Sequence, residues 1–454
     1  MKTLSIMLGS ILFNCLTFVT FSRGQTLKEN IYTEIQNIRP CFRRMNSTNV
    51  IGCTSEKGGN VGVLMYVETL ADFHRLRELE EFAPFIILVD PYIFKADLLH
   101  TFKSSGLVTG VLLPGIKDGR WKDHYPKEGY SDDSKCPSSS LPNNHAPCPA
   151  QSPWNAVGSG TMWENWGFPI FLLENSTFTE QIHSCYTTHN TGPALAWPLC
   201  ALELTSNMYA AQDSATCLRR SALFSISPVT VCDPLSDENL HYFVRPRDPA
   251  SSPREEDGSV LVVTARLDAL SMFDQVETGF DSPSSGIVTL LAVANIVTRK
   301  MKTLSFTGGI KNILFFLIHG ESFDFIGSTR LVHDMAQDSF PFNISAEEAR
   351  EKFPNGSQLP FQLSSIHSVL EVGQVASQGQ DTALHLHTRN SPAAVTAALL
   401  AHKGELCVSE AADSLPPTSA VSFLAARPDI PSVVVTNYRD QFTNKSRNTA
   451  RYFN

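Results

Sequence analysis

Hydrophobic and polar positions alternate along the chain in two blocks, which are separated by a proline-rich stretch. The first block holds apolar runs and amphipathic stretches in turn, at 61–68, 71–82, 85–90, 96–105 and 106–115. Short apolar runs between segments of helical period are typical of strands that alternate with helices. The pattern therefore predicts a small α/β unit that begins near Cys41.

The middle of the chain loses this periodicity. From 117 to 166 glycine, proline, serine and asparagine dominate, which is typical of a long loop. An apolar run at 168–174 resumes the α/β unit, and 206–220 has helical character. The proline-rich stretch 243–258 predicts a linker, so we expect a small lobe over 25–242 with a long loop at 117–166.

The second block predicts a larger α/β lobe over 259–443. Its expected strands lie at 259–269, 312–320, 368–376, 383–388 and 432–438, and its expected helices at 284–301 and 325–337. Strands separated by helices indicate a mostly parallel sheet that is covered by helices on both faces. The 454-residue length and the 42% hydrophobic content suit two or three such lobes.

The first 24 residues have the pattern of a cleaved secretory signal. A basic start at Lys2 precedes an apolar stretch, and small residues at Ser22 and Gly24 stand before Gln25. An uncleaved anchor is the alternative, although four polar residues interrupt the apolar stretch. No later segment has 18 consecutive apolar residues, so we expect the chain to be luminal or extracellular. The net charge of −9 disfavours nucleic acid as a partner.

Secretion changes how the ten cysteines are interpreted. Cys15 belongs to the expected signal, and eight of the others form neighbouring pairs, Cys41 with Cys53, Cys136 with Cys148, Cys185 with Cys200 and Cys217 with Cys232. Because no C-x-x-C motif occurs, we expect local disulfides rather than zinc sites. Cys407 is left over, either as a buried thiol or as an intermolecular partner. Five glycosylation motifs, at Asn46, Asn175, Asn343, Asn355 and Asn444, agree with a luminal chain.

Charged residues follow three of the expected strands in the larger lobe. Arg266 and Asp268 follow the first, Glu321 follows the second, and Glu371 lies inside the third. Ligands of open α/β sheets bind at the carboxyl ends of the strands, so these carboxylates suggest a metal or acid/base site. The alternative is that each caps a helix, pairs with arginine or faces solvent.

Two further features allow simpler interpretations. Asp324 is expected to cap the helix that begins at Phe325. His385 and His387 alternate on a strand and share a face, which could serve a metal but is commoner in ordinary strands. We expect no metal and no cofactor.

The motifs HGESFDFIGSTRLVHDM, VCDPLSD, TARLDA and EVGQVA together resemble the nicastrin family, the glycosylated receptor subunits of the γ-secretase complex. The resemblance runs from about Cys41 to about Asn444. It implies a disulfide-stapled small lobe and a large lobe with a mixed, mostly parallel sheet, similar to zinc aminopeptidases. It also implies presenilin, Aph-1 and Pen-2 type partners, and stubs of type I membrane proteins such as Notch and the amyloid precursor as substrates.

The same resemblance implies that the peptidase site is degenerate. Gly320 and Glu321 stand where those enzymes have Gly-Glu-Glu. The positions expected to have carried ligands or their neighbours are Arg266, Asp268, Ser282, Ser322 and Glu371. A two-zinc site needs about five ligands, and the resemblance leaves this sequence with only one or two of them. The chain is therefore expected to be non-catalytic.

Recognition is the role that the resemblance assigns instead. The residues associated with it are Glu321, Asp324, Phe325, Ile326, Gly327 and Ser328. Glu321 either pairs with a substrate amine or supports the fold. The loop around Trp154 would form a lid over the pocket.

The chain departs from the family at its end. Residues 444–454 match no known pattern, and the family continues into a membrane-spanning helix. A secreted binding glycoprotein that acts as a decoy is therefore one alternative, and an active secreted aminopeptidase is another.

Overall fold

The computed structural model describes residues 32–36, 38–45, 50–115, 130, 154–155, 158–192, 194–221, 226, 228, 230–245, 257–273, 279–303, 311–340, 348, 351, 361–376, 383–390, 408–410 and 415–442. The chain divides into two compact units, Met1–Ile38 and Arg39–Asn454. The architecture that positions the candidate site belongs to the second unit.

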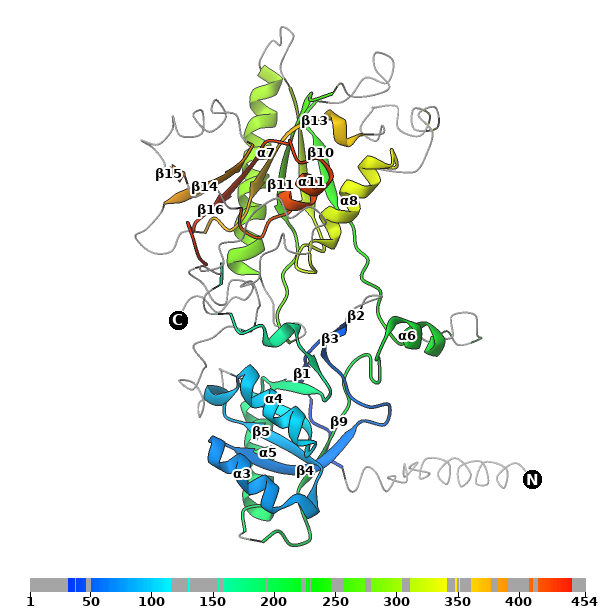
Figure 1. Ribbon diagram of the computed structural model, residues 1–454, viewed down its shortest axis with the longest axis vertical. Coiled ribbons are helices and arrows are strands. Elements are labelled where there is room, and N and C mark those ends of the chain that lie inside the picture. The colour runs from blue at the N-terminus through cyan, green and yellow to red at the C-terminus, as the bar shows by residue number, and fades with distance from the viewer. Residues whose placement is uncertain are drawn as a thin grey trace, which may run out of the picture. The chain divides into compact units, whose positions relative to one another are not determined.

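The small lobe is built on a six-stranded sheet in the order β1-β8-β6-β5-β4-β9 (Figure 1). Its strands are β1 (Ile38–Pro40), β4 (Asn60–Val67), β5 (Phe85–Val89), β6 (Val108–Pro114), β8 (Ile170–Leu173) and β9 (Ala201–Leu204). Strands β4, β5, β6 and β8 run parallel, and β9 pairs with β4 antiparallel. Its helices are α3 (Leu70–Glu78), α4 (Ala96–Ser105), α5 (Ser176–His189) and α6 (Ser214–Arg220). Every residue of β5 is buried, as a central strand of a covered sheet requires.

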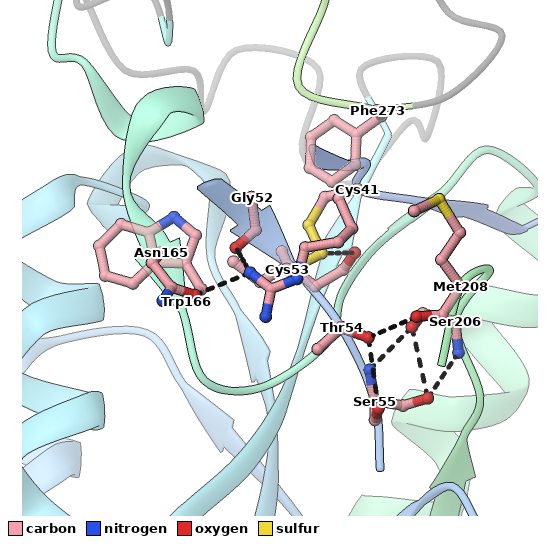
Figure 2. Close-up of a disulfide and its surroundings, with 12 residues drawn as sticks. Cys41, Gly52, Cys53, Thr54, Ser55, Asn165, Trp166, Ser206, Met208 and Phe273 are labelled. Carbon is pink, nitrogen blue, oxygen red and sulfur yellow. Dashed lines mark hydrogen bonds between the residues drawn. A yellow bond between two sulfur atoms is a disulfide. The ribbon is translucent and has the colours of Figure 1, made fainter. Parts of the chain in front are cut away.

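The small-lobe part of the chain also forms a separate three-stranded sheet. It consists of β2 (Arg43–Met45), β3 (Val50–Cys53) and β7 (Asn165–Trp166). The disulfide between Cys41 and Cys53 closes the β2–β3 hairpin, and Figure 2 shows it beside Phe273. Backbone bridging joins Cys41 to Phe273, so this hairpin contacts the segment that follows the first strand of the large lobe.

The large lobe contains a seven-stranded sheet in the order β10-β12-β11-β13-β16-β14-β15. Its strands are β10 (Leu240–Phe243), β11 (Val260–Arg266), β12 (Asn312–Ile318), β13 (Ile366–Val372), β14 (Leu384–Arg389), β15 (Val408–Glu410) and β16 (Ser432–Thr436). The four central strands are parallel, whereas β10 and β14 pair antiparallel with β12 and β16. The sheet is therefore mixed and mostly parallel.

Helices cover both faces of this sheet. They are α7 (Ser285–Thr303), α8 (Ile326–Ala336) and α11 (Ala420–Ala426) (Figure 1). Val263 and Phe315 pack with Leu290 of α7. Their strand neighbours point to the opposite face and pack with α8 and α11. This alternation follows from the two-residue period of a strand. The short helical turns are η1 (Glu80–Phe82), η2 (Pro91–Ile93), η3 (Thr161–Trp163), η4 (Phe280–Ser284) and η5 (Leu363–Ser365).

The structure confirms the predicted fold class and three of the four predicted disulfides. The bonded pairs are Cys41–Cys53, Cys185–Cys200 and Cys217–Cys232. Strand β10 lies before the expected linker but belongs to the large-lobe sheet. Among the described residues, no helix is both long enough and apolar enough to cross a membrane.

Several expectations fall outside the described residues. They are the signal at 1–24, the pair Cys136 and Cys148, Cys407, the tail at 444–454, and the glycosylation motifs at Asn46, Asn343, Asn355 and Asn444. Asn175 is described, and its side chain caps α5 by accepting a hydrogen bond from the Thr177 N–H at 2.9 Å. Its glycosylation stays a prediction.

Candidate functional site

Three carboxylates lie at the carboxyl ends of neighbouring strands, as the sequence predicted. Asp268 follows β11, Glu321 follows β12 and Glu371 lies near the end of β13. Their exposed fractions are only 6%, 3% and 4%, although carboxylates are almost never fully buried without partners. Each must therefore have hydrogen-bond partners that offset the cost of burial.

Asp268 binds the backbone of the turn that follows β12. Its Oδ1 accepts from the Glu321 N–H at 2.9 Å, and its Oδ2 accepts from the Ser322 N–H at 2.8 Å. The Ser322 hydroxyl donates to the Asp268 carbonyl oxygen at 3.2 Å and accepts from Arg266 at 2.6 Å. Both oxygens of the Asp268 carboxylate are thus engaged in holding this turn.

Glu321 caps helix α8 from within its own chain segment. Oε1 accepts from the Ser328 N–H at 2.6 Å, and Oε2 accepts from the Ser328 hydroxyl at 2.9 Å. Free N–H groups of the first helical turn are satisfied in this way, and a negative charge there also matches the helix dipole.

The prediction that Asp324 caps this helix is wrong. Helix α8 begins at Ile326, one residue later than expected, and the capping position is Phe325, which has no side-chain cap. Asp324 and Phe325 have φ values of 63° and 56°, so both adopt the left-handed conformation. An Asp side chain caps from extended backbone, which Asp324 does not have, and Glu321 already occupies the N–H of Ser328.

Gly327 makes this arrangement possible. A Cβ at Gly327 would lie 1.7 Å from the His319 carbonyl oxygen and 2.9 Å from Glu321 Oε1. Gly320, with φ +82°, lets the chain reverse directly before Glu321. Two glycines thus allow the strand end, the carboxylate and the helix to approach closely.

Glu371 plays the corresponding part for helix α11. Its Oε2 accepts from the Ala420 N–H at 3.2 Å and also from the Thr418 hydroxyl. Burial raises the pKa of Glu371 to about 7, and the negative charge of Glu321 acts in the same direction. The hydrogen bonds from Thr418 and Ala420 act in the opposite direction.

Arg266 supplies positive charge to this group. Burial raises the pKa of Glu321, while the hydrogen bonds from Ser328 and the charge of Arg266 oppose that rise. Arg266 opposes the rise at Glu371 as well. The guanidinium therefore acts on both buried carboxylates.

The remaining position that the resemblance assigns to a former metal site is Ser282. It is buried in η4, next to Asp281, whose Oδ2 accepts from the Gln374 amide at 2.6 Å. Sequence reasoning did not single out Asp281 or Gln374. Among the described residues, no group of three or more histidine, cysteine, aspartate or glutamate side chains is arranged to hold a metal ion.

Of the residues expected to recognise a substrate, only part of the turn reaches the surface. Asp324 is exposed, and Ile326 has an exposed fraction of 41%. Phe325 and Gly327 are partly buried, whereas Glu321 and Ser328 are buried. The structure thus brings these six residues into one turn, with two exposed side chains and one buried carboxylate.

Trp154, expected in a lid, packs against the end of the large lobe. Its ring centroid lies 6.1 Å from that of Tyr438 and 6.5 Å from that of Phe442. Its carbonyl oxygen accepts from the Phe442 N–H at 2.7 Å. Its ring also meets His387, whose Nε2 lies 2.9 Å from Thr436 Oγ1. His387 is thus a buried strand histidine, while His385 is partly exposed.

Two residues of this region left no signal in the sequence. The Ser422 hydroxyl lies 2.7 Å from that of Ser328 and so joins α11 to α8. Arg44, in β2, lies against the turn through Phe323. Both contacts depend on tertiary packing between segments far apart in the chain, which no local pattern reveals.

Comparison with known proteins identifies relatives over most of the chain. Two family models match, the nicastrin small lobe over residues 40–210 and the nicastrin large lobe over residues 259–451. Nicastrin of Homo sapiens is 32% identical over 95% of this chain and 60% of that protein. Nicastrin of Mus musculus is 32% identical over 93% of this chain and 59% of that protein. The chain thus spans about three fifths of the length of these relatives.

A solved structure shares the fold. The crystal structure of the gamma-secretase component nicastrin matches with a TM-score of 0.66 and 20% identity, over 92% of this chain and 71% of that chain. A zinc aminopeptidase from Bacillus subtilis matches with a TM-score of only 0.43, which is too low to support an argument.

Proposed function

Because this chain belongs to the nicastrin family, we propose that it acts as a non-catalytic glycoprotein subunit of the γ-secretase complex. Its part there is to recruit or gate stubs of type I membrane proteins, of the Notch and amyloid precursor kind, for intramembrane cleavage. The partners in this proposal are presenilin, Aph-1 and Pen-2 type subunits.

The observation that carries the non-catalytic role is the use of Glu321. A general base must reach a water molecule or a substrate, but this carboxylate is 3% exposed and both its oxygens accept from Ser328. Asp268 is likewise committed to two backbone N–H groups, and Arg266 donates to Ser322. These contacts support a structural use of the positions that the aminopeptidase pattern assigns to catalysis.

Recognition in this proposal takes place on the exposed side of the turn. Asp324 offers a carboxylate and Ile326 an apolar side chain, which suit a peptide segment with a cationic and an apolar group. Two consecutive left-handed residues that are not glycine are costly, and such strain tends to persist where function requires it. Glu321 then supports the turn and does not contact the substrate.

The segment around Trp154 serves as the lid in this proposal. Its packing on Tyr438 and Phe442 supports a closed position of that segment against the large lobe. Aromatic pairs of this kind each add roughly 0.5–1.5 kcal/mol beyond the burial of their area.

The proposal is tested by co-purification of the tagged chain with presenilin, Aph-1 and Pen-2 type subunits from detergent-solubilised cells. We expect recovery of all three together with a tagged substrate stub. Recovery of the chain from the medium alone would contradict the proposal and favour a secreted binding glycoprotein.

Surface variants separate recognition from assembly. Asp324→Asn combined with Ile326→Ser should reduce stub recovery while leaving subunit recovery unchanged. The matched control is Leu70→Ser, which alters a side chain of α3 that is 63% exposed. Equal stub recovery by the two variants would exclude the turn as the recognition surface.

A further inference from the structure

Arg44 lies on the small-lobe hairpin that is closed by a disulfide. It belongs to β2 and pairs with Ile51 of β3, between Cys41 and Cys53. The hairpin is also joined by its backbone to the large-lobe segment, because the Phe42 N–H donates to the Met272 carbonyl oxygen at 3.3 Å. The backbone that carries Arg44 is therefore held at several points.

The guanidinium of Arg44 lies over two aromatic rings. Its Cζ is 4.0 Å from the ring centroid of Phe323 and 4.8 Å from that of Trp163. Phe323 belongs to the turn that contains Glu321, and Trp163 lies near the end of the loop 117–166 that also contains Trp154. Guanidinium groups at these distances are attracted by the faces of aromatic rings. One side chain thus contacts both segments that the proposed function uses.

The charges of two carboxylates also act on this guanidinium. Burial lowers the pKa of Arg44 to about 10, whereas the charges of Asp324 and Asp268 act in the opposite direction. The side chain therefore stays protonated at neutral pH. Its NH1 group is buried and has no hydrogen-bond acceptor among the described residues. Ring contacts and charge, rather than a hydrogen bond from NH1, account for its place.

We propose that Arg44 is a positioning residue for the candidate recognition turn, which it fixes by covering Phe323 and attracting Asp324. The inference deepens the proposed function, and it rests on that function only for its effect on substrate recovery. Within the large lobe the turn is held by Asp268 and by the contact of Glu321 with Ser328, and Arg44 supplies a further anchor from the other lobe. Loss of Arg44 frees the exposed side of the turn while the capped helix remains.

Amide hydrogen exchange of the purified glycoprotein tests the anchor directly. Arg44→Leu should speed exchange in the peptide 321–328 by about tenfold and leave the strands of either sheet within about twofold of the wild type. Arg44→Lys, which keeps the charge but not the planar group, should give an intermediate value. The matched control is Arg77→Leu, which removes an arginine that lies 5.9 Å from the Phe73 ring in α3.

A second variant separates positioning from general destabilisation. Asp324→Asn should speed exchange of 321–328 in the wild type. It should add little in the Arg44→Leu background, because both changes remove the same attraction between Arg44 and Asp324. The inference is overturned if Arg44→Leu affects 321–328 no more than Arg77→Leu does, or if both changes add fully. If Arg44→Leu does not fold, Arg44→Gln, which also removes the charge and the guanidinium but keeps a polar side chain, replaces it in both comparisons.

Stub recovery distinguishes this inference from the proposed function. If both hold, Arg44→Leu lowers stub recovery without changing subunit recovery. Faster exchange with unchanged stub recovery would confirm the anchor and exclude recognition by this turn. Unchanged exchange with a stub recovery that depends on Asp324 and Ile326 would keep the proposed function and overturn the role of Arg44.

Discussion

Gly327 lies where the turn after β12 enters helix α8, and it has almost no room for a side chain. A Cβ there would lie 1.7 Å from the His319 carbonyl oxygen, which is backbone and cannot move aside cheaply. We therefore predict that Gly327→Ala lowers the free energy of unfolding by about 3 kcal/mol or more, through displacement of the strand end or of α8. Chemical denaturation of the purified glycoprotein measures this.

Gly167→Ala is the matched control for that substitution. A Cβ at Gly167 meets no atom within 4 Å, and its φ lies outside the left-handed region. We expect this variant to unfold within about 0.5 kcal/mol of the wild type. Equal effects at the two positions would show that the turn and α8 are less closely packed than described.

Glu371 gives the large lobe a pH dependence whose direction follows from its burial. Its pKa rises from 4.5 to about 7 on folding, so the folded chain holds the proton more tightly than the unfolded chain. Its contribution is most favourable below pH 4.5 and is lost as the pH rises through 7. The change amounts to about 3 kcal/mol at most.

Glu371→Gln should therefore flatten the dependence of unfolding free energy on pH. Relative to the wild type, the variant should have a lower free energy of unfolding at pH 5 than at pH 8. Glutamine carries no charge to bury, so only the wild type loses stability as the pH rises. Urea denaturation at both pH values tests this, with the exposed Glu78→Gln as control. A wild type whose difference between the two pH values matches that of Glu371→Gln would exclude a raised pKa.

At the scale of elements, helices α8 and α11 are joined at their first turns. Ser328 and Ser422 place their hydroxyls 2.7 Å apart, and the capping carboxylates Glu321 and Glu371 serve one helix each. Ser328→Ala and Ser422→Ala should each destabilise the chain by about 1 kcal/mol, and the double variant by less than the sum.

A double-mutant cycle measured by chemical denaturation provides the test. We expect a coupling of roughly 0.5–1 kcal/mol between the two serines. The control pair is Ser328→Ala with Ser104→Ala, because Ser104 donates only within α4 and should show no coupling. Coupling of equal size in both pairs would contradict a specific link between the helices.

The start of helix α8 shows why the sequence predicted the element but not its cap. The apolar period located the helix to within one residue at each end. Asp324 stood in the usual capping position, yet the carboxylate that accepts from the Ser328 N–H belongs to Glu321, seven residues before Ser328. The left-handed backbone at Asp324 and Phe325 lets the Glu321 carboxylate reach Ser328. This contact also depends on Gly327, which lies against the His319 carbonyl oxygen in the folded chain, and a local sequence pattern does not reveal that packing.

Other elements were missed for related reasons. Helix α5 carries many serine and threonine residues and lacks a clear apolar stripe, and β10 is a four-residue edge strand. Strands β11 and β12 were predicted because they are nearly continuous apolar runs, as buried parallel strands are. Strand β13 was predicted from the apolar residues on either side of Glu371. Because these three strands were expected to be neighbours in one parallel sheet, Asp268, Glu321 and Glu371 were predicted to lie at the same edge. Arg44 comes from the other lobe, and no local pattern predicted its contact with the turn.

At the scale of the whole molecule, Trp154 connects the long loop of the small lobe to the last described segment of the large lobe. It is 6% exposed and packs with Tyr438 and Phe442. Trp154→Ala should lower the free energy of unfolding by about 3 kcal/mol, because a buried aromatic side chain is lost and a cavity remains. It should also speed hydrogen exchange in 438–442, the segment that follows β16.

Trp197→Ala is the matched control, because this tryptophan is 79% exposed. It should leave both stability and exchange in 438–442 unchanged. A lid closed by Trp154 requires more than lost stability, since β16 must keep its protection while the segment after it loses protection. If exchange rose equally in β16 and in 438–442, Trp154 would be an ordinary core residue. That result would contradict the proposal that the long loop acts as a lid.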